Sequence, residues 1–180
     1  ISKSHVTYMS EVALTIFDSM KKIHGLERRE RLLLEIAVLL HDCGKYISMS
    51  QVGDCSFNII MATEIIGLSH REREIIALVV RYNTQRFGYY PEISRLTGLS
   101  EADYILVAKL TAILRLANAL DRAHKQKIQG LKVSLQDQKL VIRLEIARDF
   151  TLERGLLEEK LDFFEEVFNL RPEIRLKKLV

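Results

Sequence analysis

The sequence predicts a mainly α-helical fold, a helical bundle that carries a small β-hairpin, helix and strand at its C-terminal end. Two observations indicate this fold class. Apolar residues recur every three or four positions from Ser4 to about Lys127, as on the buried face of a helix. After Gly130 the pattern changes to an alternation of apolar and polar residues, which is typical of strands. We therefore expect a helical domain over residues 1–128 and a small α+β subdomain over residues 129–180.

The first two helices are predicted by an apolar stripe and by a nearly continuous apolar run. "HVTYMSEVALTIFDSMKKIH" repeats apolar residues at helical spacing, and His24-Gly25 is a helix-ending pair. The second helix is expected over about residues 27–41. It has one polar residue, Glu35, between Arg31 and its end, so it is expected to be buried on nearly all sides. Gly44 is then expected to turn the chain.

The middle of the chain predicts three further helices. One covers about residues 56–66 and stops at Gly67. The next opens with "SHRE" at 69–72, a capping box in which a serine and a glutamate satisfy each other's backbone amides. A loop containing Gly88 and Pro91 follows, and Ser100 caps a long helix.

The C-terminal part predicts a hairpin, a helix and a strand. "LKVSLQDQKLVIRLEI" alternates apolar and polar residues on either side of "QDQ", which indicates a hairpin. "LERGLLEEKLDFFEEVF" is an amphipathic helix, and "PEIRLKKL" is the expected last strand.

Composition limits the class of protein. The 180 residues are 48% hydrophobic and 28% charged, a mixture typical of globular domains. No apolar run approaches the ~20 residues that span a bilayer, and the start shows no signal peptide, so we expect a cytoplasmic protein with no membrane partner. Cys43 and Cys55 are expected to be reduced thiols. The chain opens on Ile1, which indicates a piece of something longer, and its net charge of +3 is compatible with an anionic partner.

Three predicted helices carry polar residues where their pattern is apolar. His5 lies at the edge of the first stripe, His41-Asp42 ends the second helix, and Asp121 continues the stripe of the long helix. An unpaired buried carboxylate costs several kcal/mol or becomes protonated. One divalent cation bound by these two histidines and two aspartates would offset that cost. Imidazole and carboxylate ligands suit Mn, Mg, Fe or Zn.

Each residue also has a purely structural interpretation. His5 alone would be a hydrogen-bonded core histidine, and Asp42 alone would cap the turn at Gly44. Asp121 alone would pair with a nearby cation. The candidate cations are Arg115, Arg122 and Lys125. The order His … His-Asp … Asp, spread over three helices that pack inward, favours the metal site.

This order resembles the HD-domain phosphohydrolase superfamily. The family's fold is a helical bundle whose metal is held by a histidine, an adjacent His-Asp pair and a later aspartate. "HDCGK" is similar to the family's frequent His-Asp-x-Gly-Lys string. The resemblance implies that His5, His41, Asp42 and Asp121 are metal ligands. It also implies catalytic roles for Asp42 and for Lys45, which would stabilise charge on a phosphate.

A narrower resemblance covers almost the whole chain. "LLLEIAVLLHDCGKYI", "IIGLSHREREIIALVVRYN", "ILRLANALDRAHKQKI" and "FFEEVFNL" are similar to the C-terminal HD-like domain of exopolyphosphatase and guanosine-pentaphosphate phosphatase enzymes. In that family, N-terminal actin-like ATPase-fold domains carry the phosphate-hydrolysing site. The C-terminal domain helps to hold polyphosphate and to form a dimer. The resemblance thus implies a partner that is polyphosphate or a phosphorylated nucleotide, a homodimer, and a principal active site outside this chain.

Two departures from the family pattern favour one metal over two. Where HD domains with two metals carry further histidines, the candidate positions here hold Cys55 and Asn83. An asparagine is a poor ligand for a transition metal, and a cysteine would have to be a thiolate.

The resulting hypothesis is an accessory domain of an exopolyphosphatase-like hydrolase, with guanidinium and ammonium groups that bind phosphate. The candidate substrate-binding residues are Arg81, Arg115, Arg122 and Lys125. One alternative is an independent metal-dependent phosphohydrolase, and another is a catalytically dead dimerisation or regulatory module. The sequence disfavours nucleic acid as a partner, because the basic string "RAHKQK" lacks interleaved aromatic residues.

Overall fold

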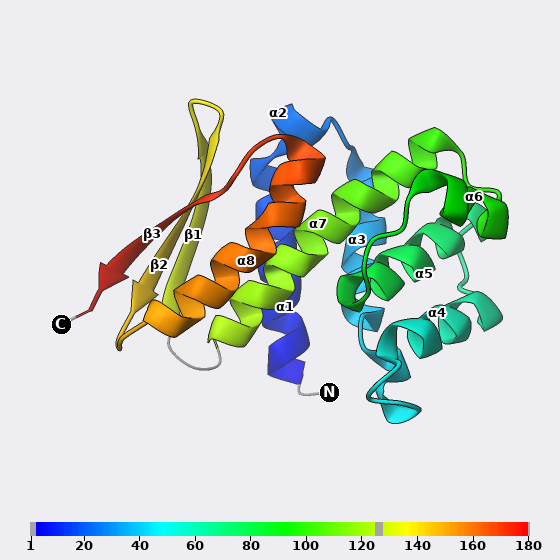
Figure 1. Cartoon of the computed structure of the whole chain (residues 1–180), viewed down its shortest axis with the longest axis horizontal. Helices are drawn as coiled ribbons and strands as arrows, with labels where there is room; N and C mark the ends of the chain where they lie inside the picture. The colour runs from blue at the N-terminus through cyan, green and yellow to red at the C-terminus, as the bar shows by residue number, and fades with distance from the viewer. Residues whose placement is uncertain (1–2, 125–127, 180) are drawn as a thin grey trace. The chain divides into compact units, whose positions relative to one another are not determined.

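The computed structural model describes residues 3–124 and 128–179, with side chains over 6–122 and 128–179. Within these ranges the predicted mainly helical class is confirmed (Figure 1). The helices are α1 (Lys3–Ser19), α2 (Lys21–His24), α3 (Arg28–Leu40), the 3-10 helix η1 (Cys43–Tyr46), α4 (Val52–Ala62), α5 (His70–Thr84), α6 (Tyr90–Thr97), α7 (Glu101–His124) and α8 (Thr151–Phe168). The strands are β1 (Ile128–Gln136), β2 (Lys139–Ile146) and β3 (Glu173–Lys178).

Backbone contacts divide the chain into two compact units. The sheet unit consists of residues 1–27 and 115–180, and the helical unit consists of residues 28–114. The division into units therefore does not follow the change of sequence pattern near residue 128. The reason is that α1 packs against β1, so the N-terminal helix belongs with the sheet.

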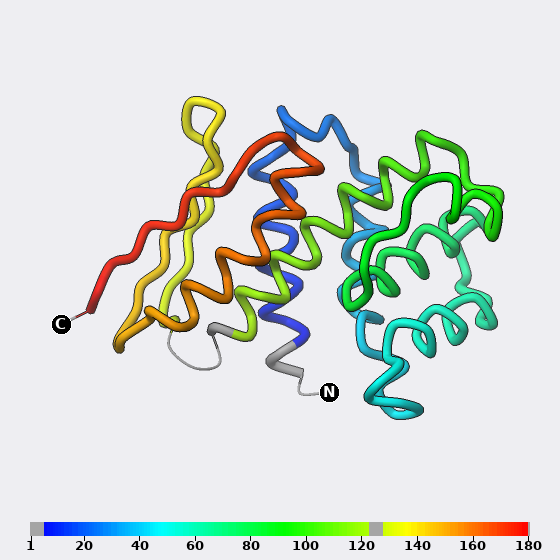
Figure 2. The backbone as a smooth tube through the Cα atoms, viewed as in Figure 1, coloured from blue at the N-terminus to red at the C-terminus, as the bar shows by residue number. Residues whose placement is uncertain are grey.

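The sheet unit is built on three strands in the order β1-β2-β3. β1 and β2 form the predicted antiparallel hairpin, whose turn residues Asp137 and Gln138 both have positive φ, and β3 pairs parallel to β2 (Figure 2). Helix α8 connects β2 to β3. Its buried residues Leu157, Leu161 and Phe164 follow helical spacing and form one apolar stripe.

The capping box predicted at 69–72 is present at the start of α5 in the helical unit. Ser69 Oγ accepts from the amide of Glu72 at 3.1 Å, and Glu72 Oε1 accepts from the amide of Ser69 at 3.0 Å. Arg29 of α3 donates to both carboxylate oxygens of Glu72, at 2.5 and 2.8 Å. These hydrogen bonds lower the pKa of Glu72 to about 2 and join two helices of the unit.

The structure differs from the sequence prediction in three places. The expected loop around Gly88 and Pro91 contains α6, in which Pro91 occupies the first turn, where its missing amide proton costs no hydrogen bond. The third helix is α4, which begins at Val52, before the expected residue 56, and ends at Ala62. The first helix is interrupted at Met20 into α1 and α2. No described helix has both the length and the apolarity needed to cross a membrane.

Candidate functional site

His41 follows the last residue of α3 and is 6% exposed. Its Nδ1 lies 2.6 Å from the carbonyl oxygen of Val38. Because a carbonyl only accepts, Nδ1 carries the proton in this hydrogen bond. The lone pair of a neutral ring is then on Nε2, which lies 3.9 Å from Asp42 Oδ2. The end of α3 thus fixes the ring in the tautomer that a metal-binding histidine needs on its Nε2.

Asp42 precedes η1 but does not cap it, since its side chain makes no capping hydrogen bond. Its Oδ1 atom is buried and has no hydrogen-bond partner among the described residues. The amide of Gly44 instead donates to Ser56 Oγ at 2.8 Å. The alternative interpretation, in which Asp42 caps the turn at Gly44, is therefore wrong. A buried carboxylate oxygen without a donor is an expensive feature, and a cation would compensate for it.

Gly44 holds η1 against α4. A Cβ atom added to it would lie 2.5 Å from the backbone nitrogen of Ser56 and 2.8 Å from Cys55 Cβ. The glycine is therefore needed for close packing, and its φ is not positive, so its role differs from the conformational freedom expected of a turn. Ser56 was missed by the sequence analysis, because a serine inside an apolar helix gives no signal of its distant partner.

The cysteines are free thiols, as predicted. Burial raises the pKa of the Cys43 thiol, which disfavours a thiolate at neutral pH. Asn83 lies on α5, and both polar atoms of its amide are buried without a hydrogen-bond partner among the described residues. The absence of a second metal at Cys55 and Asn83 stays a prediction.

Asp121 lies on the part of α7 that belongs to the sheet unit, and it is 1% exposed. The prediction that it points with the apolar stripe of its helix is confirmed. Tyr8 of α1 lies close enough to Asp121 for the charge of that carboxylate to affect its pKa. Burial, followed by the negative charges of Asp121 and Glu11, raises the pKa of Tyr8 to about 12. Tyr8 was not singled out from the sequence, since a tyrosine on an amphipathic helix is most often a core residue.

The four predicted metal ligands are placed as follows. His41 and Asp42 are adjacent in the helical unit, Asp121 belongs to the sheet unit, and the side chain of His5 lies outside the described residues. Among the side chains described, no group of three or more His, Cys, Asp or Glu residues is arranged to hold a metal ion. Convergence of all four ligands stays a prediction, and the pair His41-Asp42 is the part that the structure shows together.

The predicted phosphate-binding residues have different environments. Arg81 donates through Nε and Nη2 to Asp54 Oδ1, both at 3.0 Å, and its guanidinium lies over the Phe57 ring. Arg115 lies 4.3 Å from the ring centre of Phe163, and burial lowers its pKa. The exposed cations of the predicted set are Arg122 and Lys45, and the side chain of Lys125 lies outside the described residues.

The described fold is a mainly helical domain that carries a buried His-Asp pair at the end of α3. The chain belongs to the Ppx/GppA phosphatases: the family model "Ppx/GppA phosphatase, domain III" matches residues 1–164. The chain is also similar to the guanosine-5'-triphosphate,3'-diphosphate pyrophosphatase of Photobacterium profundum, with 23% identity over 147 residues. That match covers 82% of this chain and 29% of the relative, so the chain spans less than a third of the relative's length. The family resemblance predicted from the sequence is confirmed.

Proposed function

We propose that this chain is an accessory domain of an exopolyphosphatase-like phosphoanhydride hydrolase. In this proposal it binds polyphosphate or a phosphorylated nucleotide, holds one divalent cation, and contributes to a homodimer. The observation that carries the proposal is the match of residues 1–164 to domain III of the phosphatase family, in a chain that covers 29% of its pyrophosphatase relative. A domain of this kind would act with the N-terminal actin-like ATPase-fold domains of a longer protein.

The metal proposal is supported by the chemistry of the His41-Asp42 pair. The hydrogen bond from His41 Nδ1 to Val38 directs the lone pair of a neutral ring to Nε2, and Asp42 keeps one buried oxygen without a hydrogen-bond donor among the described residues. Neutral imidazole and carboxylate fit Mn, Mg, Fe or Zn. His5 and Asp121 would complete the set. When bound, such a cation would neutralise phosphate charge and polarise a phosphoryl oxygen.

The exposed cations Lys45 and Arg122 are the best candidates for phosphate contacts in this proposal. Lys45 follows Asp42 by three residues on η1 and is exposed. Arg81 is a weaker candidate than the sequence suggested, because the carboxylate of Asp54 already takes up part of its hydrogen-bonding capacity. The phosphate-binding role predicted for Lys125 stays a prediction, because its side chain lies outside the described residues.

Calorimetric titration of the 180-residue chain with a defined polyphosphate, in the presence of Mn²⁺, tests the proposal. We expect binding that weakens in Lys45→Gln and Arg122→Gln and that persists in Lys160→Gln, an exposed lysine of α8 outside the predicted set. We also expect no phosphate release by this chain alone. Phosphate release would favour the independent hydrolase instead. Dimers in sedimentation without any polyphosphate binding would favour a dimerisation module.

A further inference from the structure

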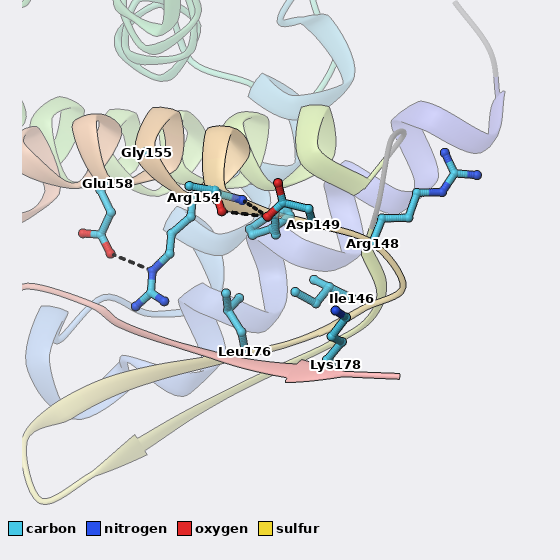
Figure 3. A pocket seen from close by; sticks show the side chains of 10 residues that line it. Ile146, Arg148, Asp149, Arg154, Gly155, Glu158, Leu176 and Lys178 are labelled. Carbon is cyan, nitrogen blue, oxygen red and sulfur yellow. Dashed lines mark hydrogen bonds and ion pairs between the residues drawn. The ribbon is translucent and has the colours of Figure 1, made fainter. Parts of the chain in front are cut away.

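The sheet unit contains a cavity of about 540 Å³ that the proposed function does not use. It opens between the first turns of α8 and the C-terminal ends of β2 and β3, and every lining residue belongs to this unit (Figure 3). Its volume falls within the range of pockets that bind small organic molecules.

The cavity combines an apolar floor with basic side chains. Ile146 and Phe150 are buried, and Leu176 points from β3 toward α8 (Figure 3). Arg154 extends from α8 toward the same strand, and Lys178 is the strand neighbour of Ile146. The two cations lie on opposite sides of Leu176, so a ligand in this position would place an apolar body on the floor and an acidic group at Lys178 (Figure 3).

The acidic residues of the cavity already have partners. Asp149 Oδ1 accepts from the amide and the hydroxyl of Thr151, at 3.2 and 2.7 Å, and so supports the first turn of α8. Glu158 lies 3.9 Å from Arg154 and 3.3 Å from Arg171, so it is shared between two guanidinium groups. Lys178 has no ion pair within the described ranges. Arg148, Arg154 and Lys178 line the cavity against the carboxylates of Asp149 and Glu158, so the cavity offers a net positive charge to a ligand.

Gly155 is an independent sign that this wall is kept open. It lies inside α8, where a glycine destabilises a helix relative to alanine. Neither packing nor a positive φ requires it, since an added Cβ would meet no atom within 4 Å. Because Gly155 lines the cavity, its missing side chain lets a ligand approach the helix backbone.

From these observations we propose that the cavity binds a small organic anion, in which one phosphate or carboxylate is attached to a flat apolar body. Lys178 binds the acidic group, Ile146, Leu176 and the Gly155 backbone contact the body, and Arg154 flanks the body on the other side of Leu176 (Figure 3). The site uses none of the predicted metal ligands, so it stands or falls separately from the proposed function.

Titration of the isotopically labelled 180-residue chain with four probes, followed by nuclear magnetic resonance, tests this site. 1-Naphthyl phosphate and 2-naphthoate carry both features, whereas inorganic phosphate and 2-naphthol carry one each. We expect one or both of the naphthyl anions to shift the Gly155 amide and the Leu176 methyl signals, and to bind at least tenfold more tightly than either single-feature probe. Which anion binds identifies phosphate or carboxylate as the acidic group.

Two pairs of variants separate binding from folding. Gly155→Leu should abolish binding while the helix becomes more stable, and Gly155→Ala should retain part of it. Lys178→Gln should weaken binding about three- to tenfold, through loss of a charge-assisted hydrogen bond. Lys177→Gln, on the opposite face of β3, should leave it unchanged. The proposal is overturned if neither naphthyl anion shifts these signals, or if Gly155→Leu binds as the parent does.

Discussion

Replacing Gly44 with alanine tests how the His-Asp segment is held against α4. The added methyl carbon would lie 2.5 Å from the backbone nitrogen of Ser56, and 2.8 Å from both Cys55 Cβ and Ser56 Oγ. Ordinary contacts begin at 3.4 Å, so η1 would have to move by roughly 1 Å. Such a shift also breaks the hydrogen bond from the Gly44 amide to Ser56 Oγ, which is 2.8 Å long and buried.

The expected cost follows from these two effects. Overpacking a well-packed site costs about 1–3 kcal/mol, and a buried amide left without its acceptor costs about 1–3 kcal/mol. Alanine also lowers the conformational entropy of the unfolded chain, which offsets about 0.4–1 kcal/mol of this cost. We therefore expect Gly44→Ala to lower the free energy of unfolding by about 1–5 kcal/mol. Ser56→Ala, which removes only the hydrogen bond, should cost about 1–3 kcal/mol.

Equilibrium urea unfolding, followed by far-ultraviolet circular dichroism, measures these changes. Because Gly44→Ala and Ser56→Ala break the same hydrogen bond, the double variant should cost less than the sum by about 1 kcal/mol. Gly155→Ala is the matched control: the same substitution in open space should stabilise the chain by about 0.5–1 kcal/mol. A Gly44→Ala variant within about 0.5 kcal/mol of the parent would refute the close approach of η1 to α4.

Two further predictions concern ion pairs. The pKa of Glu72 is lowered to about 2 by Arg29, so the stability it contributes is present above pH 4.5 and is lost as the pH falls from 4.5 toward 2. The free energy of unfolding, measured at several pH values, should therefore fall less steeply in Glu72→Gln than in the parent between pH 4.5 and 2. Equal slopes would contradict the pairing of Glu72 with Arg29. Arg171 is surrounded by three partly exposed carboxylates, which raise its pKa. Arg171→Gln should destabilise by less than about 1 kcal/mol in low salt, and thermal melts should show the difference vanishing in high salt, whereas a salt-independent loss would point to packing instead.

Local sequence signals predicted the elements that depend on neighbouring residues. The capping box at 69–72 and the hairpin around Asp137 both formed where expected, because their hydrogen bonds join residues close in the sequence. α6 was missed because Gly88 and Pro91 indicated a loop. Its support comes from elsewhere: Tyr104 of α7 donates to the Gly88 carbonyl at 2.9 Å. No local pattern could have shown that contact.

The candidate site was predictable only in part for the same reason. Polar residues within apolar stripes identified His41, Asp42 and Asp121, and all three are largely buried. Their partners across the fold were not visible in the sequence. Arg81 contacts the carboxylate of Asp54, and Gly44 contacts the hydroxyl of Ser56. Each contact joins two consecutive helices through residues more than one helical turn apart in the sequence, so no local pattern shows it. These contacts changed the interpretation of Arg81 and of the turn after Asp42.

Thermal melts of the parent and of Asp42→Ala, each with and without added Mn²⁺, test most directly whether the His41-Asp42 pair holds a metal. Removing Asp42 removes a ligand but also a buried carboxylate oxygen that has no donor among the described residues, so the two metal-free proteins should be about equally stable. Mn²⁺ at a hundred times its Kd should stabilise the parent by about 2.7 kcal/mol and leave Asp42→Ala unmoved. Asp162→Ala, at an exposed carboxylate of α8, should respond as the parent does. A parent melt that does not move with Mn²⁺, or an Asp42→Ala melt that moves equally, would contradict the metal site and leave His41-Asp42 as a structural pair.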